Sequence, residues 1–373
     1  MQPLFRLFVD SSPEKWLAMN ELSHHNAQLA ANHPDVWQIW QTVAKSVSVL
    51  LNDVTEEEVL DVLGICSTNN ANLNLGDKNG PSTPMGRGTG LYLTYARMNH
   101  SCYCNTRAVK YDDFRYTTRG ESLCERIIYV CVSQPRIVVR AAINIRKGEE
   151  IYGQYVKPHM TTVERRETLL RKWNFRCECP RCVDETEFGT HFSAVLCQKC
   201  NIGPLYPAEN NNEGLACLAC SCSFPESEIE KLGQRLERIL SRCPKNNQSV
   251  TDFLEEQLYE LGSILHPNHS TIIDFSRKLV AAYKLKPVLT RTEYQRVTQL
   301  CQQILEVLGR VDPGYSSWRG DILCELIRSK VASTKIDLGR GQTTFEKLVS
   351  VLKEEKFLAI YLARYKNVYF GEQ

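Results

Sequence analysis

The chain has 373 residues, of which 43% are apolar and 24% are charged, and its formal net charge is +2. That length allows two or three domains with cores of their own, and the composition argues against extended disorder. The near-neutral charge gives no support to a general nucleic-acid-binding role or to a polybasic membrane role.

The N-terminal residues have no charged segment followed by an apolar one, and no window reaches eighteen apolar residues. We therefore expect neither a signal peptide nor a transmembrane helix, and a cytoplasmic or nuclear location. In a reducing compartment, clustered cysteines are more often metal ligands or redox thiols than disulfides. Of the sixteen cysteines, eight fit zinc positions, and most of the others are expected to be small buried apolar residues.

The first 66 residues are predicted to be helical, because Trp37, Trp40, Val43 and Val47 recur at helical spacing. Thr55, with a glutamate three residues later, predicts a capped helix start. Residues 67–90 are rich in Asn, Gly, Pro and Ser and are predicted to form a loop.

Short β-like runs follow, at residues 126–132, 135–142 and 149–155. Residues 162–173 then predict an amphipathic helix whose basic residues form a solvated face. Those basic residues are Arg165, Arg166, Arg171 and Lys172. After residue 224, five to seven amphipathic helical stretches are separated at Pro244, Pro267, Pro287 and Pro313-Gly314. They predict a separate helical domain, for which stacked helical hairpins are one arrangement.

Two cysteine arrays precede the helical domain. Cys197-x-x-Cys200 and Cys217-x-x-Cys220 match the four-thiolate zinc template and predict a zinc ribbon. Cys222 is an alternative to Cys220, and four unligated buried thiols are the alternative for the whole array. The other array, Cys177-x-Cys179-x-x-Cys182, is one thiol short, so its site is either open for chemistry or completed from elsewhere in the chain.

Three segments, in order, resemble the SET and post-SET segments of the SET-and-MYND-domain lysine methyltransferases. They are GLYLTYARMNHSCYCN (90–105), RKGEEIYGQY (146–155) and TTVERRETLLRKWNFRCECPRC (161–182). The resemblance covers about residues 60–185, and the added zinc ribbon is most similar to the arthropod branch of the family. It does not extend to the family's N-terminal SET strands, with their Gly-x-Gly-like turn, or to the family's MYND finger.

The resemblance implies an α+β fold in five parts. These are a helical insert (1–66), a β-rich SET core incomplete at its N-terminus (67–160), a post-SET zinc segment (161–185), a zinc ribbon (186–224) and an all-α C-terminal domain (225–373). It also implies that Cys102, from the NHSC motif, completes the first zinc site with Cys177, Cys179 and Cys182. Cys104, in the same loop, is a competing ligand.

The activity implied is S-adenosylmethionine (SAM)-dependent N-methylation of lysine in a histone or another protein. By resemblance, Tyr155 is the catalytic tyrosine and also contacts the cofactor. Asn69, Asn99, His100, Trp173 and Phe175 are the other expected cofactor-binding residues. For Trp173 and Phe175, a purely structural role beneath the zinc site is the alternative.

The alternative function is a catalytically inactive SET scaffold, whose ribbon and helical domain bind protein partners. Tyr155 and the intact NHSC motif favour the enzyme. The missing N-terminal strands, Cys104 in place of proline and the charged Arg97 favour the scaffold. A nucleic-acid-binding ribbon has little support, because residues 197–222 contain one lysine and no arginine.

Overall fold

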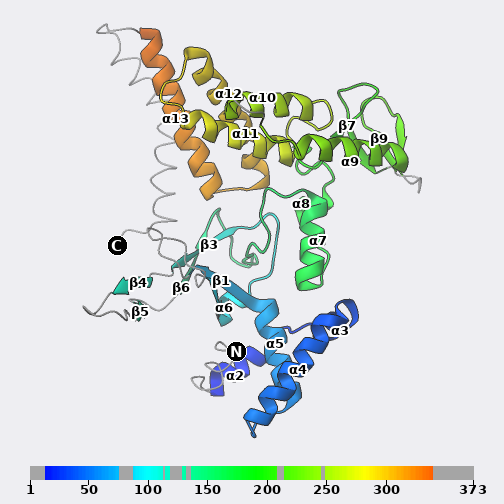
Figure 1. Ribbon diagram of the computed structural model, residues 1–373, viewed down its shortest axis with the longest axis vertical. Helices are drawn as coiled ribbons and strands as arrows, with labels where there is room; N and C mark the ends of the chain where they lie inside the picture. The colour runs from blue at the N-terminus through cyan, green and yellow to red at the C-terminus, as the bar shows by residue number, and fades with distance from the viewer. Residues whose placement is uncertain are drawn as a thin grey trace.

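The computed structural model describes residues 13–74, 87–111, 114–117, 128–131, 136–207, 214–244 and 248–338. The helices of residues 226–338 and the ribbon strands of residues 195–225 lie at one end of an elongated molecule, and the helices of residues 13–69 lie at the other (Figure 1). The strands of residues 70–74, 106–111 and 136–141 and the helix of residues 162–173 lie between these two ends. Within the described ranges, no helix combines the length and the apolar character needed to cross a membrane.

The described N-terminal residues are mostly helical, as predicted, and residues 1–12 of the predicted helical region lie outside the described ranges. The helices are α2 (Pro13–Asn20), α3 (Asn26–Asn32), α4 (Pro34–Leu50) and α5 (Glu56–Asn69). Helix α5 begins with the predicted capping box, in which Thr55 and Glu58 each bond the other's backbone N–H. Met19 and Leu22 pack with Val62 and Ile65 in a small core between α2 and α5.

Three antiparallel strand pairs form the central region. They are β1 (Asn70–Asn74) with β2 (Arg87–Leu91), β3 (Thr106–Tyr111) with β6 (Arg136–Ala141), and β4 (Phe114–Thr117) with β5 (Ile128–Cys131). Helix α6 (Leu93–Ala96) follows β2. The predicted loop over residues 67–90 was therefore wrong at both ends, where α5 and then the β1–β2 pair occur; residues 75–86 lie outside the described ranges.

The strand predicted over residues 149–155 was also wrong. This segment makes one isolated parallel bridge, between His100 and Gly153, and belongs to no sheet. The reason is tertiary: it crosses the loop before β3, where side chains satisfy backbone groups that a neighbouring strand would otherwise pair. Asn105 bonds the Glu150 carbonyl and the Tyr152 N–H, and Thr106 bonds the Tyr152 carbonyl.

Helix α7 (Thr162–Trp173) has the predicted bounds and precedes a short helix, α8 (Pro180–Val183). The ribbon is a four-stranded antiparallel sheet in the order β10-β9-β8-β7. Its strands are β7 (Val195–Leu196), β8 (Pro204–Pro207), β9 (Gly214–Cys217) and β10 (Ser223–Pro225). An antiparallel bridge from Val195 to Leu265 joins the ribbon to the helical domain.

Within the described residues, the helical domain contains five helices, which agrees with the five to seven helical stretches predicted. The five helices are α9 (Glu226–Leu240), α10 (Val250–Leu261), α11 (Ser270–Lys284), α12 (Arg291–Val311) and α13 (Ser317–Leu338). The largest apolar core lies here and includes Leu261, Ile273, Leu279, Ile304 and Leu308. The predicted domain continues beyond residue 338, outside the described ranges.

Candidate functional site

The first cysteine array meets Cys102, and the four Sγ atoms lie within 4.8 Å of one another. Cys102 Sγ is 3.9 Å from that of Cys177 and 3.5 Å from that of Cys182. Tetrahedral zinc with Zn–S bonds of about 2.3 Å places its sulfurs about 3.8 Å apart, whereas a disulfide joins sulfurs at about 2.0 Å. The four thiols thus fit a shared zinc ion and are not disulfide-bonded.

The local sequence positions the three thiols that follow α7. The helix starts at a capping box between Thr161 and Glu164 and ends at Asn174, whose φ of 56° is the left-handed conformation that stops a helix. Pro180 begins the short helix α8, and the Cys182 N–H bonds the Cys179 carbonyl. This turn holds Cys179 and Cys182 on one side of the cluster.

The alternative ligands lie outside the two cysteine clusters. Cys104 is buried, and its thiol donates to the Thr106 carbonyl at 3.2 Å while the Arg107 guanidinium donates to its sulfur at 2.9 Å. In the ribbon, Cys220 belongs to the cluster, and the Cys222 carbonyl accepts from the Cys217 N–H. The chain geometry therefore brings Cys102 and Cys220 to the clusters in preference to their neighbours.

Helix α7 does not present a wholly solvated basic face, which corrects the prediction for that run. Arg165 is fully buried, and Arg171 and Lys172 are exposed. One guanidinium nitrogen of Arg165 lies 3.6 Å from Cys182 Sγ, and another donates to the Met160 carbonyl at 2.7 Å. Four thiolates around Zn²⁺ carry a net charge of −2, so a buried guanidinium beside them offsets part of that charge.

Glu187 is the buried counter-ion that the sequence did not reveal. Its carboxylate accepts from Arg165 at 3.0 Å and from Arg181 at 2.7 Å, and all three side chains are at most 1% exposed. Burial by itself would raise the pKa of Glu187, but the guanidiniums of Arg181 and Arg165 lower it overall, so the carboxylate is ionised. Arg181 also donates to the Val311 carbonyl at the end of α12. The network thus links the zinc segment to the helical domain.

The second cluster is in the ribbon and contains Cys197, Cys200, Cys217 and Cys220. The Sγ atoms of Cys197 and Cys220 are 3.6 Å apart, and those of Cys200 and Cys217 are 3.7 Å apart, which again fits tetrahedral zinc. Backbone N–H groups point at the sulfurs, and the Gly203 N–H is the main cause that lowers the pKa of Cys200 to about 6. Donors directed at sulfur favour the thiolate form, which is the form that binds metal.

Tyr155 lies against the first cluster. Its hydroxyl donates to the Met98 carbonyl at 2.6 Å, and its ring lies between His100, with centroids 5.2 Å apart, and Trp173, at 5.0 Å. Burial is the main cause that raises the pKa of Tyr155, followed by Tyr95, so the phenol stays protonated and a donor at neutral pH.

His100 connects this tyrosine to the thiols. Its Nδ1 accepts the Tyr155 N–H at 3.1 Å, which leaves the proton on Nε2, 3.2 Å from Cys102 Sγ. Burial lowers the pKa of His100 to about 4, so the ring is neutral. A neutral ring of this tautomer can donate to a thiolate, so His100 can orient Cys102 for metal binding.

The NHSC loop and the segment before Tyr155 cross and bond each other. The Gly153 N–H bonds the Asn99 carbonyl at 2.8 Å, and the Ser101 N–H bonds the Gly153 carbonyl at 3.3 Å. Asn105, which was not among the predicted site residues, stabilises this crossing through its two bonds to Glu150 and Tyr152. Its position at the end of the NHSCYCN motif was the available signal.

The remaining predicted cofactor residues surround the same region. Trp173 donates from Nε1 to the Thr68 carbonyl at 2.9 Å, next to Asn69. The Asn69 amide bonds the Ser23 and Ile65 carbonyls and so secures the end of α5. Trp173 and Phe175 are half-buried and pack against the core that contains Cys102, Cys177 and Cys182, so the structural role left open for them is present in the fold.

Asn99 is exposed, and its amide donates to the Glu150 carboxylate at 2.7 Å. Arg97, the charged residue that departed from the expected pattern, is also exposed and pairs with Glu21. The side chains fit a ligand such as SAM by their chemistry: aromatic faces suit adenine and a sulfonium cation, and an exposed carboxamide offers both a donor and an acceptor.

The chain is similar to several SET proteins, although no family model matches it. It is 27% identical over 266 residues to SET domain-containing protein SmydA-8, isoform A, of Drosophila melanogaster, which covers 70% of this chain and 47% of that protein. It is 26% identical over 240 residues to histone-lysine N-methyltransferase ASHR1 of Arabidopsis thaliana, covering 61% and 44%. A SET and MYND domain-containing protein of Dictyostelium discoideum is 25% identical over 146 residues, covering 37% and 27%. The chain thus spans less than half the length of each of these relatives.

Proposed function

Because this chain is a homologue of the SET and MYND domain-containing proteins, we propose that it is a SAM-dependent protein-lysine N-methyltransferase. The observation that supports it most is the position of the Tyr155 hydroxyl. This protonated hydroxyl bonds the Met98 carbonyl, and its ring packs against His100 and Trp173. The rings lie beside the thiol cluster, where Cys102 meets Cys177 from 75 residues away. A reaction that needs an amine held in line with a methyl donor requires a reacting group whose position is fixed in this way.

Each residue has a distinct role in this proposal. When bound, SAM supplies a methyl group on a sulfonium. Trp173 and Phe175 exclude water and offer aromatic faces to cationic groups. The Tyr155 hydroxyl, fixed through the Met98 carbonyl, orients the neutral amine of a substrate lysine. Asn99 and His100 hold the cofactor from the NHSC loop, and the zinc cluster keeps that loop against the post-SET turn.

Calorimetric titration with SAM tests whether the chain binds the cofactor. Saturable binding at micromolar levels that Asn99→Ala abolishes supports the proposal. Because Asn99 is exposed and bonds Glu150, its removal leaves the buried clusters intact. No binding at millimolar SAM by a chain that retains its zinc would overturn the proposal. The catalytically inactive scaffold would then be the remaining function. The bond between the Asn99 amide and Glu150 is consistent with that function.

Methyl transfer to histones, followed with labelled SAM, tests Tyr155. We expect Tyr155→Phe to keep ring packing but to lower the rate by roughly 100-fold, the size of effect that a misplaced reacting group causes. Tyr103→Phe is the matched control, because Tyr103 packs on Phe188 and is not in the proposed site. An equal loss in both variants would argue against the assigned role of Tyr155.

A further inference from the structure

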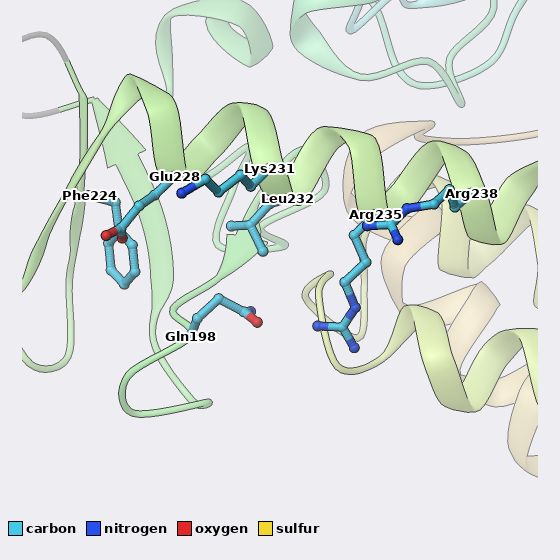
Figure 2. Close-up of a pocket in the computed structure, with 7 residues that line it drawn as sticks. All are labelled: Gln198, Phe224, Glu228, Lys231, Leu232, Arg235 and Arg238. Carbon is cyan, nitrogen blue, oxygen red and sulfur yellow. The ribbon is translucent and has the colours of Figure 1, made fainter.

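The ribbon and α9 line an open groove of about 270 Å³ that the proposed function does not use. Figure 2 shows α9 along one side, with Arg235 and Leu232 pointing into the space and Gln198 facing them from a ribbon loop. The lining residues are Gln198, Phe224, Glu228, Lys231, Leu232, Arg235 and Arg238. In Figure 1 this end of the molecule lies apart from α5 and β1.

The spacing of charges along α9 places its cations on this groove. Lys231, Arg235 and Arg238 recur at intervals of three or four residues, which keeps them on one side of a helix. All three are exposed, and Leu232, on the same side, is half-buried. The helix therefore presents to the groove a line of positive charge with the apolar side chain of Leu232 beside it.

The groove is strongly cationic in a chain whose net charge is only +2. The ribbon adds Lys199, whose ammonium lies 5.7 Å from the Phe224 ring, and Glu228 is the one acidic lining residue. Among the described residues, none of these four cations forms an ion pair. Arg235 donates to the Ser263 hydroxyl at 2.8 Å, and Arg238 to the Gln234 carbonyl of its own helix.

We propose that this groove binds an acidic peptide segment of a protein partner. Successive cations on α9 are about 4.5–6 Å apart along the helix axis, and same-side residues of an extended peptide are about 7 Å apart, a difference that the long Lys and Arg side chains can span. A strand with acidic residues at alternate positions can therefore pair with the line of cations, while Leu232 and the Gln198 amide contact its backbone and apolar atoms.

The geometry favours a peptide over other anions. A site for a single phosphate requires cations that converge on one point, whereas these cations lie in a line. Single-stranded nucleic acid is bound through exposed aromatic rings, and Phe224 is only 3% exposed. None of the lining residues belongs to the proposed methyl-transfer site, so this inference does not rest on the methyltransferase proposal.

Fluorescence anisotropy of the full chain with a labelled alternating Glu-Ser peptide tests the inference. We expect binding that weakens as salt is added, because the contacts are solvent-exposed charges. The double variant Lys231→Glu with Arg238→Glu should weaken binding by at least about tenfold. The matched double control is Lys45→Glu with Lys147→Glu, which changes the net charge equally at exposed residues elsewhere.

Zinc content and circular dichroism of both double variants establish that they fold. Unchanged affinity in the control together with the tenfold loss in the groove variant supports the inference. Equal affinities in the two double variants, or no peptide binding by the parent chain, would overturn it. Tighter binding of a labelled oligouridine than of the peptide would also overturn it and would assign the groove to nucleic acid.

Discussion

Cys102 and Cys104 stand two residues apart, and both are buried, yet their sulfurs have different surroundings. Cys102 Sγ faces three other thiols and the His100 ring. Cys104 Sγ faces the Thr106 carbonyl and the Arg107 guanidinium. A thiol among thiols favours a metal, whereas a thiol between a carbonyl and a cation is already satisfied as a weak donor and acceptor.

This contrast predicts the zinc content of single-residue variants. We expect the parent chain to hold two zinc ions, one in each cluster, and Cys102→Ser to hold one, because three thiolates no longer close the first site. Plasma mass spectrometry of dialysed protein measures this directly.

The matched control is Cys104→Ser, which keeps a small donor and acceptor at the same position and should retain both ions. Loss of zinc in Cys104→Ser with retention in Cys102→Ser would reverse the ligand assignment.

At the scale of elements, the turn between α12 and α13 fits closely against the central strands. Arg107 of β3 pairs with Asp312 and donates to the Pro313 carbonyl at 2.9 Å. Gly314 follows with a φ of 78°, and a Cβ there would lie 2.1 Å from the Ala142 carbonyl oxygen. Only glycine meets both the conformational and the steric requirement at this position.

We therefore predict that Gly314→Ala lowers the free energy of unfolding by about 1–3 kcal/mol, through backbone strain and displacement of the turn. Urea unfolding followed by tryptophan fluorescence measures the change, and hydrogen exchange should show faster exchange near residue 142.

Gly309→Ala is the matched control. A Cβ at Gly309, inside α12, meets no atom within 4 Å, so alanine there should stabilise by about 0.5–1 kcal/mol. Destabilisation of similar size in both variants would contradict the close approach at Gly314.

At the scale of the whole molecule, buried ions join the zinc segment to the helical domain. Arg165 comes from α7 and Arg181 from α8, and Glu187 lies between them. Arg181 reaches Val311 at the end of α12, and Ser193, just before the ribbon, donates to Glu187. A buried network of this kind holds several parts of the chain in one arrangement.

The prediction is that Glu187→Gln destabilises the protein by about 3–5 kcal/mol, because it leaves two buried guanidiniums without a carboxylate. Thermal or urea unfolding gives the size of the effect. Hydrogen exchange should increase together around α7, α8 and the end of α12.

Glu306→Gln is the matched control at an exposed ion pair with Arg310 and should change stability by about 0–1 kcal/mol. A Glu187→Gln effect as small as this would mean that the buried network contributes little to the junction.

Local patterns in the sequence predicted much of this fold. The capping box at Thr55, the bounds of α7 and the helices after residue 224 all depend on contacts within one or two turns. The two Cys-x-x-Cys turns of the ribbon are equally local, because the cysteines of each pair are only three residues apart. Residues 149–155 were wrongly predicted as a strand, because their composition resembles one while their bonding partners lie some 45 residues away.

The sequence by itself determined the helices, the two cysteine arrays and the identity of the groups available for chemistry, since these follow from spacing along the chain. The family resemblance implied Cys102 and left Cys104 as a competitor, and the tertiary structure decided that Cys102 joins thiols 75 and 80 residues away. It also decided that Arg165 is buried beside Glu187 while Arg171, on the same helix, stays in solvent. Both outcomes depend on which surfaces pack together, and packing is a property of the folded chain that no local pattern of residues contains.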